Sequence, residues 1–308
     1  MQKLRFVVSL ITDENDYQRQ QATAAQEAAA RLGVDLQILF AKSDAIHQSQ
    51  QLLDIIQTRD SGVSGILVEP ASRTAFPKVA QAAISAGIAW VVLNCEADYL
   101  SELRAVGTAT AFAVSADNHE VGRLQGRQLA ALLPRGGSVL YIQGPSHSSV
   151  TEQRAAGMLE SKPDSINIKV LKSANWTEDA GFNAVSSWLR LSTAHQEQID
   201  VVQAQNDFLA LGARRAMEKQ NDGSSENRSS QNQKSRLSFL GVDGLAKTGQ
   251  AWVRQGILAA TVVVPPVTSH ALDALVAALQ GHVPQSERTL VAPESFPVPG
   301  ALAAKSAT

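Results

Sequence analysis

Residues 4–33, LRFVVSLITDENDYQRQQATAAQEAAARLG, contain the pattern that decides the fold. The run at 4–11 is mostly apolar and does not alternate with polar residues, which predicts a β-strand buried on both faces. The polar residues at 12–16 predict a loop, and the Ala- and Gln-rich residues at 17–32 predict a helix. Gly33 is of the residue type that most often ends a helix. The stretch is therefore one strand–loop–helix unit of an α/β protein.

The same unit recurs along the chain and then starts again. Further strands are expected at 34–40, 65–68, 88–93, 138–142, 166–171, 199–204, 237–241 and 257–264. Helices are expected at 44–56, 78–86, 117–133, 150–160, 177–191, 208–218, 245–255 and 267–279. Residues 221–235 contain no apolar side chain and predict a polar loop. Because strands separated by helices form parallel sheets covered on both faces, the pattern predicts two similar, doubly wound α/β lobes.

The composition excludes several classes of protein. A length of 308 residues suits two domains, and 27 Lys and Arg against 29 Asp and Glu give a formal net charge of −2. This balance argues against a nucleic-acid partner, because phosphate binding needs a basic surface. The single cysteine, Cys95, excludes an internal disulfide. No apolar run reaches 18 residues, so no direct membrane insertion is expected.

Motifs of catalysis and cofactor binding are not found in the sequence. The loop after the first strand begins Thr-Asp-Glu-Asn at 12–15, where a glycine-rich phosphate or dinucleotide loop would stand. The histidines have no metal-ligand spacing, and the segment at 144–148 lacks the last glycine of a nucleophile elbow. We therefore expect no catalytic residue, no metal site and no cofactor, and the chain is predicted not to be an enzyme.

Ligands of parallel α/β sheets bind beyond the carboxyl ends of the strands. This rule selects the residues that follow the predicted strands, namely 13–18, 69–70, 94–96, 144–152, 174–176, 205–207 and 243. Most of these residues are polar, and Tyr17 and Trp176 are aromatic. The sequence therefore predicts a polar ligand site at these strand ends.

Five segments, in order along the chain, resemble the type I periplasmic sugar-binding proteins. They are GVSGILVEP at 62–70, DNHEVG at 117–122, NDFLALGA at 206–213, GVDG at 241–244 and GILAATV at 256–262. The family includes ribose-binding proteins and is similar to the effector domain of lac-type repressors. Each motif is short, but the five keep the family's order over nearly the whole chain.

The resemblance implies the type I periplasmic-binding fold, in which two lobes joined by a three-strand hinge close on a ligand held between them. It places the first lobe at 1–115 and 265–291, and the second at 116–264 and 292–308. It further implies non-enzymatic binding of a small polar ligand, a sugar or polyol, in the service of ABC-type uptake. The implied partner is a membrane permease or a sensor protein.

The family's ligand positions fall on residues of both predicted lobes. They are Asn15, Tyr17, Gln18, Glu69, Asn94 and Cys95 in the first lobe, and Glu152, Trp176, Asn206 and Asp243 in the second. Amides and carboxylates can bind the hydroxyls of a sugar, and aromatic rings can cover its C–H faces.

Four of these positions have an ordinary structural interpretation as well. Asp243 precedes Gly244 and can be a turn residue, and Asn206 can cap the helix that follows it. Trp176 and Tyr17 can be core aromatics. For Asn206 the two interpretations are compatible.

The chain departs from the family's pattern at four places. The family's Asp-Arg or similar polar pair after strand four is Asn94-Cys95 here, and its glutamine near the last hinge strand falls on Val264. Its second aromatic in the first loop is replaced by Gln18, and its arginine of the second lobe falls on Glu152, with Arg154 two residues further on. Acids at Glu69 and Glu152 need partners if they are buried. We therefore expect a ligand other than ribose, one that carries an amine or many donor hydroxyls.

Two other functions stay open from the sequence. One is a cytosolic ligand-sensing module without a transporter, and the other is an enzyme on the same two-lobed scaffold. The compartment is open too: periplasmic if an export signal has been removed, cytoplasmic if Met1 is the native start.

Overall fold

The computed structural model describes residues 3–58, 61–72, 76–105, 110–146, 148–191, 198–222, 237–281 and 286–306. The chain divides into two compact units. Unit 1 comprises Met1–Ala116 and Pro265–Val291, and unit 2 comprises Asp117–Val264 and Ala292–Thr308. The chain therefore passes from one unit to the other after residues 116, 264 and 291.

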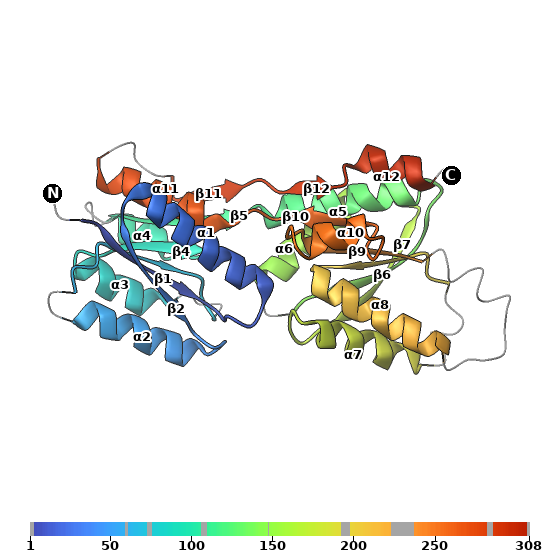
Figure 1. The fold of residues 1–308 in the computed structure, drawn as a ribbon, viewed down its shortest axis with the longest axis horizontal. Coiled ribbons are helices and arrows are strands. Elements are labelled where there is room, and N and C mark those ends of the chain that lie inside the picture. Colours follow the sequence, from blue (N-terminus) through green and yellow to red (C-terminus); the bar gives the residue numbers. More distant parts are fainter. Residues whose placement is uncertain are drawn as a thin grey trace. The chain divides into compact units, whose positions relative to one another are not determined.

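Unit 1 is a sheet of six described strands, all paired in parallel in the order β11-β5-β4-β3-β1-β2. The strands are β1 (Arg5–Leu10), β2 (Asp35–Phe40), β3 (Gly65–Val68), β4 (Ala89–Leu93), β5 (Ala111–Ala116) and β11 (Arg288–Val291). The helices are α1 (Asp16–Leu32), α2 (Ala45–Gln57), α3 (Pro77–Ser85), α4 (Leu100–Ala105) and α11 (Val267–Leu279). Helices α1 and α11 cover one face of the sheet, and α2 and α3 cover the other (Figure 1).

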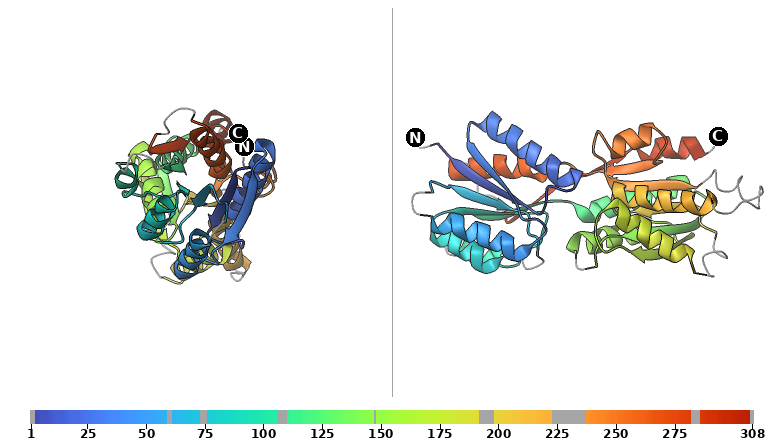
Figure 2. Two further views of the ribbon diagram at one scale, coloured as in Figure 1. Left: turned by 90° about the vertical axis from the view of Figure 1, so that its left-hand side faces the viewer. Right: turned by 60° about the horizontal axis from the view of Figure 1, so that its bottom comes forward.

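Unit 2 repeats this plan with the order β12-β10-β9-β8-β6-β7, in which β12 alone among the described strands is antiparallel to its neighbour. The strands are β6 (Gly137–Gln143), β7 (Ile166–Lys172), β8 (Val201–Ala204), β9 (Ser238–Asp243), β10 (Ala260–Val263) and β12 (Glu294–Phe296). The helices are α5 (Asn118–Leu132), α6 (Ser149–Ser161), α7 (Glu178–Leu189), α8 (Asp207–Asp222), α10 (Gly249–Arg254) and α12 (Pro299–Ser306). Figure 2 shows each sheet between two layers of helices.

Burial on both faces explains why the strands lack polar alternation. In β6, Val139 and Tyr141 belong to one hydrophobic cluster, whereas Leu140 and Ile142 belong to another. Successive residues of a strand point to opposite faces, so the two clusters lie on the two sides of the sheet. The prediction of two doubly wound, parallel α/β lobes is therefore confirmed.

Helices α5 and α6 approach each other closely through two glycines. A Cβ atom on Gly122 would lie 2.2 Å from the carbonyl oxygen of Arg154, and one on Gly157 would lie 2.0 Å from that of His119. This close approach places the start of α6, with Arg154, directly against the start of α5.

Several element boundaries differ from the sequence prediction. The helix expected at 245–255 begins at Gly249, because the preceding residues form a turn in which Thr248 N–H donates to the Leu245 carbonyl. The strand expected at 257–264 begins at Ala260, after a turn that ends α10. Strands β5, β11 and β12 and helices α4 and α12 were not among the elements predicted by residue range. Beyond residue 222, the polar loop expected at 221–235 lies outside the described residues.

Candidate functional site

The end of the loop between β1 and α1 and the first turn of α1 carry three of the predicted site residues. Asn15 is the N-cap of α1, and its Oδ1 accepts a hydrogen bond from the Gln18 backbone N–H at 2.8 Å. Gln18 is buried, and its Oε1 accepts a hydrogen bond from the Ile11 N–H at 3.0 Å. Asn15 thus fixes the first turn of α1, which holds Tyr17 and Gln18.

Four predicted residues, Tyr17, Gln18, Glu69 and Asn94, meet at the carboxyl edge of the unit 1 sheet and are called the unit 1 cluster here. Glu69 follows β3 directly, and Asn94 follows β4. Asn94 Nδ2 donates to the Tyr17 hydroxyl at 3.0 Å, and the Glu69 carboxyl accepts hydrogen bonds from Gln18 and Asn94. Two amide side chains thus reach the Glu69 carboxyl, and Tyr17 joins the cluster through Asn94.

Glu69 is the buried acid of this cluster. The residue is 7 % exposed, and its Oε2 atom is buried without a hydrogen-bond partner. Burial raises the pKa of Glu69 to about 7, while the hydrogen bonds from Gln18 and Asn94 act in the opposite direction. The group therefore changes its charge near neutral pH.

Cys95 comes directly after Asn94 but packs differently. The residue is half-buried and lies against the hydrophobic core of unit 1. Its Sγ donates to the Glu96 carbonyl at 3.3 Å. These contacts describe a packed thiol rather than a member of the unit 1 cluster.

A second cluster, the unit 2 cluster, comprises Arg154, Trp176, Asp207 and Asp243. Arg154 is 6 % exposed, and its Nε donates to Asn118 Oδ1 at 3.1 Å. Its Nη1 lies 3.8 Å from Asp243 Oδ1, and its Cζ lies 5.8 Å from the centroid of the Trp176 ring. The arginine therefore joins an acid and an aromatic side chain at the carboxyl edge of the unit 2 sheet.

Of the two acids of this cluster, Asp207 is 1 % exposed and the Asp243 side chain is 13 % exposed. Burial raises the pKa of Asp243 to about 7, and Arg154 opposes the rise. Burial and the nearby charge of Asp243 raise the pKa of Asp207 well above its ordinary value. The Asp207 carboxyl is held by the Thr261 hydroxyl at 2.7 Å and by the Gly244 N–H at 2.8 Å. Asp207 is thus fixed near Asp243 by neutral hydrogen-bond donors.

Asn206 and Trp176 are connected by a hydrogen bond. Asn206 Oδ1 caps α8 by accepting from the Leu209 N–H at 2.7 Å, and its Nδ2 donates to the Trp176 carbonyl at 2.9 Å. The indole lies against Gly144, where a Cβ atom would be 2.1 Å from Trp176 Cη2. Asn206 therefore acts as the helix cap and at the same time positions the aromatic residue.

Helix α6 places its acid and its arginine on different faces. Thr151, Arg154 and Met158 are buried, whereas Glu152 is exposed. The structure therefore brings Arg154, which was not among the predicted site residues, into the unit 2 cluster, and it leaves Glu152 at the surface. The spacing of the buried positions, i, i+3 and i+7, is the signal by which the arginine could have been found.

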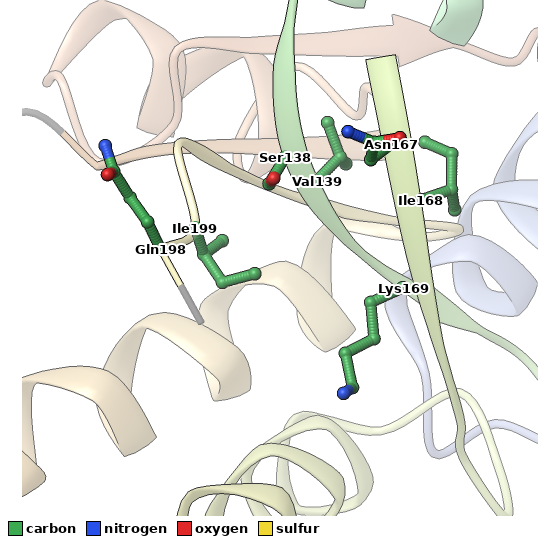
Figure 3. A pocket seen from close by; sticks show the side chains of 7 residues that line it. All are labelled: Ser138, Val139, Asn167, Ile168, Lys169, Gln198 and Ile199. Atoms are coloured by element: carbon green, nitrogen blue, oxygen red, sulfur yellow. The ribbon is translucent and has the colours of Figure 1, made fainter. Parts of the chain in front are cut away.

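A cavity of about 330 Å³ lies elsewhere, at the amino ends of β6 and β7 (Figure 3). Its lining includes Ser138, Asn167 and Lys169 and contains none of the predicted site residues. Among the described residues, no group of three or more His, Cys, Asp or Glu side chains could hold a metal ion. In the same part of the chain, no helix is both long and apolar enough to cross a membrane.

The fold agrees with the comparisons to known proteins. The family described as "Periplasmic binding protein domain" matches residues 6–282, so the chain belongs to this family. A solved structure from Actinobacillus succinogenes, an ABC transporter periplasmic solute-binding protein with bound D-allose, superimposes with a TM-score of 0.79. The two chains are 24 % identical, and the match covers 95 % of this chain and 97 % of the other. The predicted family and type I fold are confirmed.

Curated relatives match over part of their length. A putative rhizopine-binding protein of Rhizobium meliloti is 29 % identical over 60 % of this chain and 58 % of its own. A D-ribose/D-allose-binding protein of Pseudomonas aeruginosa is 34 % identical over 55 % of this chain and 52 % of its own. The chain thus spans between half and three-fifths of the length of these two relatives.

Proposed function

We propose that this protein is a non-enzymatic binding protein for a small polar ligand, a sugar or polyol. The observation that carries the proposal is the pair of clusters, each at the carboxyl edge of its sheet and each combining an aromatic ring with polar side chains. Amide and carboxylate groups suit the hydroxyls of such a ligand, and the rings suit its C–H faces. Relatives named for binding ribose, allose and xylitol support the same ligand class.

The proposed contacts come from both units. Tyr17, Gln18, Glu69 and Asn94 serve in unit 1, and Arg154, Trp176 and Asp243 serve in unit 2, with Asn206 positioning Trp176. In the proposed mechanism the ligand first binds the sheet edge of one unit. The hinge then closes, and the residues of the second edge form their contacts with the ligand. The partner that recognises the closed, ligand-bound form is proposed to be an ABC-type permease. This agrees with the transporter named for the D-allose-bound structure.

Calorimetry against a panel of sugars and polyols tests this function. Binding by the wild type, weakened about tenfold or more in Trp176→Ala and in Asn94→Ala, is the expected result. Glu27, exposed on α1, provides a matched surface control as Glu27→Gln, whose affinity should equal that of the wild type. Conversion of a bound ligand into product would favour the enzyme alternative instead.

Transport and sensing are separated by an uptake experiment. Deletion of the gene should abolish uptake of the labelled ligand by cells if a permease is the partner. Unchanged uptake together with a lost transcriptional response to the ligand would indicate the sensing alternative.

A further inference from the structure

The backbone around Glu69 is fixed by hydrogen bonds on both sides. Its N–H donates to the Ser9 carbonyl at 2.8 Å, and its own carbonyl accepts from Gln48 Nε2 at 2.9 Å. Gln48 Oε1 in turn accepts from the Ala71 N–H at 2.8 Å. The side chain is therefore presented from a rigid strand end, and its burial does not depend on a loose loop.

The donors that reach the Glu69 carboxyl are neutral amides. Gln18 Oε1 is occupied by the Ile11 N–H, and Asn94 Oδ1 is occupied by the Ala116 N–H at 3.2 Å. Both amides must therefore use their NH₂ groups toward the carboxyl. Within the described residues no cationic side chain pairs with Glu69, and its Oε2 remains without a partner.

A buried carboxylate is stable when a cation and hydrogen-bond donors compensate for the lost water. Gln18 and Asn94 provide donors but no charge, which is consistent with the raised pKa of Glu69, about 7. An ammonium group would provide both the missing charge and a donor for the unpartnered oxygen.

Unit 2 differs, because one of its two acids already faces a cation. Arg154 Nη1 lies 3.8 Å from Asp243 Oδ1. An additional cation beside Asp243 would be repelled by the positive charge of Arg154. Among the acids of the two clusters, Glu69 is therefore the one that has no nearby cation within the described residues.

We propose that the ligand is an amine-bearing sugar or polyol and that Glu69 forms an ion pair with its ammonium group. This inference rests on the proposed binding function and assigns Glu69 as the residue that determines ligand class. The remaining polar residues of the two clusters then bind hydroxyls.

Calorimetry with matched ligand pairs at pH 7 tests the assignment. The pairs are D-glucose with D-glucosamine, and myo-inositol with an amino-deoxy-inositol. The wild type should favour the amine of at least one pair by about tenfold or more, as expected for a charge-assisted hydrogen bond. Glu69→Gln keeps the shape and removes the charge, so its preference should fall below about threefold. Glu27→Gln should keep the preference, and Asp243→Asn should weaken both members of a pair to a similar degree.

The pH dependence provides an independent readout. The groups around Glu69 are Tyr17 and Gln18 from α1, Gln48 from α2 and Asn94 after β4, and a phenol stays neutral in this range. Protonation of Glu69 must then compete with the amine. Affinity for the amine should fall roughly 25-fold between pH 7.5 and pH 5.5 in the wild type, and by less than about threefold in Glu69→Gln.

The outcomes separate this inference from the general function. Tight binding of neutral sugars with no preference for amines, or binding that strengthens toward pH 5.5, would overturn the role of Glu69 and leave the sugar-binding function intact. An amine preference that Glu69→Gln retains would overturn the assignment of the residue. No binding by any member of the panel would contradict the proposed function and this inference together.

Discussion

The two units place acids at corresponding edges but surround them differently. Their strand orders match, so β1, β3 and β4 of unit 1 correspond to β6, β8 and β9 of unit 2. The helix after β6 contributes Arg154 to the acids of unit 2, whereas the corresponding helix after β1 contributes the neutral Gln18. A repeated fold therefore has one edge that provides its own cation and another that lacks one among the described residues.

The largest effect is expected from removing the cation of unit 2. Arg154→Met removes the cation beside Asp207 and Asp243 and should lower the free energy of unfolding by about 3 kcal/mol at pH 8. The loss should shrink at pH 6, which lies below the raised pKa of Asp243, about 7, so that this acid binds a proton. Urea unfolding of the wild type and the variant at pH 8 and about pH 6 measures this loss of stability.

Arg215→Met is the matched control for this variant. Arg215 is exposed and pairs with Glu178 and Asp179 at the surface, so its loss should change stability by less than about 0.5 kcal/mol. Equal effects of the two substitutions would contradict the buried ion pair in unit 2.

The second prediction concerns the acid of unit 1. The folded-state pKa of Glu69, about 7, lies above the ordinary value of 4.5, so the folded protein binds the proton more tightly than the unfolded chain does. The contribution of Glu69 to stability is therefore present below pH 4.5 and is lost as the pH rises through 7. Without ligand, the free energy of unfolding of Glu69→Gln should rise relative to that of the wild type by about 1–3 kcal/mol as the pH increases across this range.

Unfolding curves of both proteins at several pH values measure this gain. A difference between them that stays constant from pH 4.5 to 8 would show that Glu69 has an ordinary pKa.

The sequence was sufficient to predict the two sheets and most of the residues at the edge of unit 1. The residues that it did not predict were missed for a physical reason. Apolar runs separated by helices were sufficient for two parallel sheets, and strand ends were sufficient to find Glu69 and Asn94. Motif alignment alone assigned the arginine position to Glu152. Which side of α6 is buried depends on its packing against α5, and this packing turns Arg154 inward.

Asp207 lies in the strand-end segment 205–207 that the sequence selected, but it was not among the predicted site residues, for a related reason. Its neighbour Asn206 carries the visible capping signal, while Asp207 is buried because Gly241 and Gly249 leave room for its carboxyl. Cβ atoms at these glycines would lie 2.1 and 2.0 Å from the Asp207 oxygens. A contact between residues far apart in sequence is not visible in local patterns.

A moderate effect is expected from disturbing the aromatic of unit 2. Gly144→Ala places a methyl group into the Trp176 ring, which must move, and should lower ligand affinity by about tenfold. Titration calorimetry measures it. Gly300→Ala, where no atom lies within 4 Å of the added Cβ, should bind as the wild type does. An unchanged affinity in Gly144→Ala would remove Trp176 from the site.

The smallest effect is expected at Glu152. Because its side chain is exposed on α6, Glu152→Gln should change stability by less than about 0.5 kcal/mol and affinity by less than about twofold. A large loss of affinity would show that Glu152 contacts the ligand. It would also weaken the difference in charge between the edges of unit 1 and unit 2.

A crystal structure of the protein with the tightest ligand of the panel tests the central claim most directly. The account predicts one ligand that contacts Glu69 or Asn94 of unit 1 and also Arg154 or Asp243 of unit 2. A ligand bound at the amino ends of β6 and β7, or one that touches neither cluster, would contradict it.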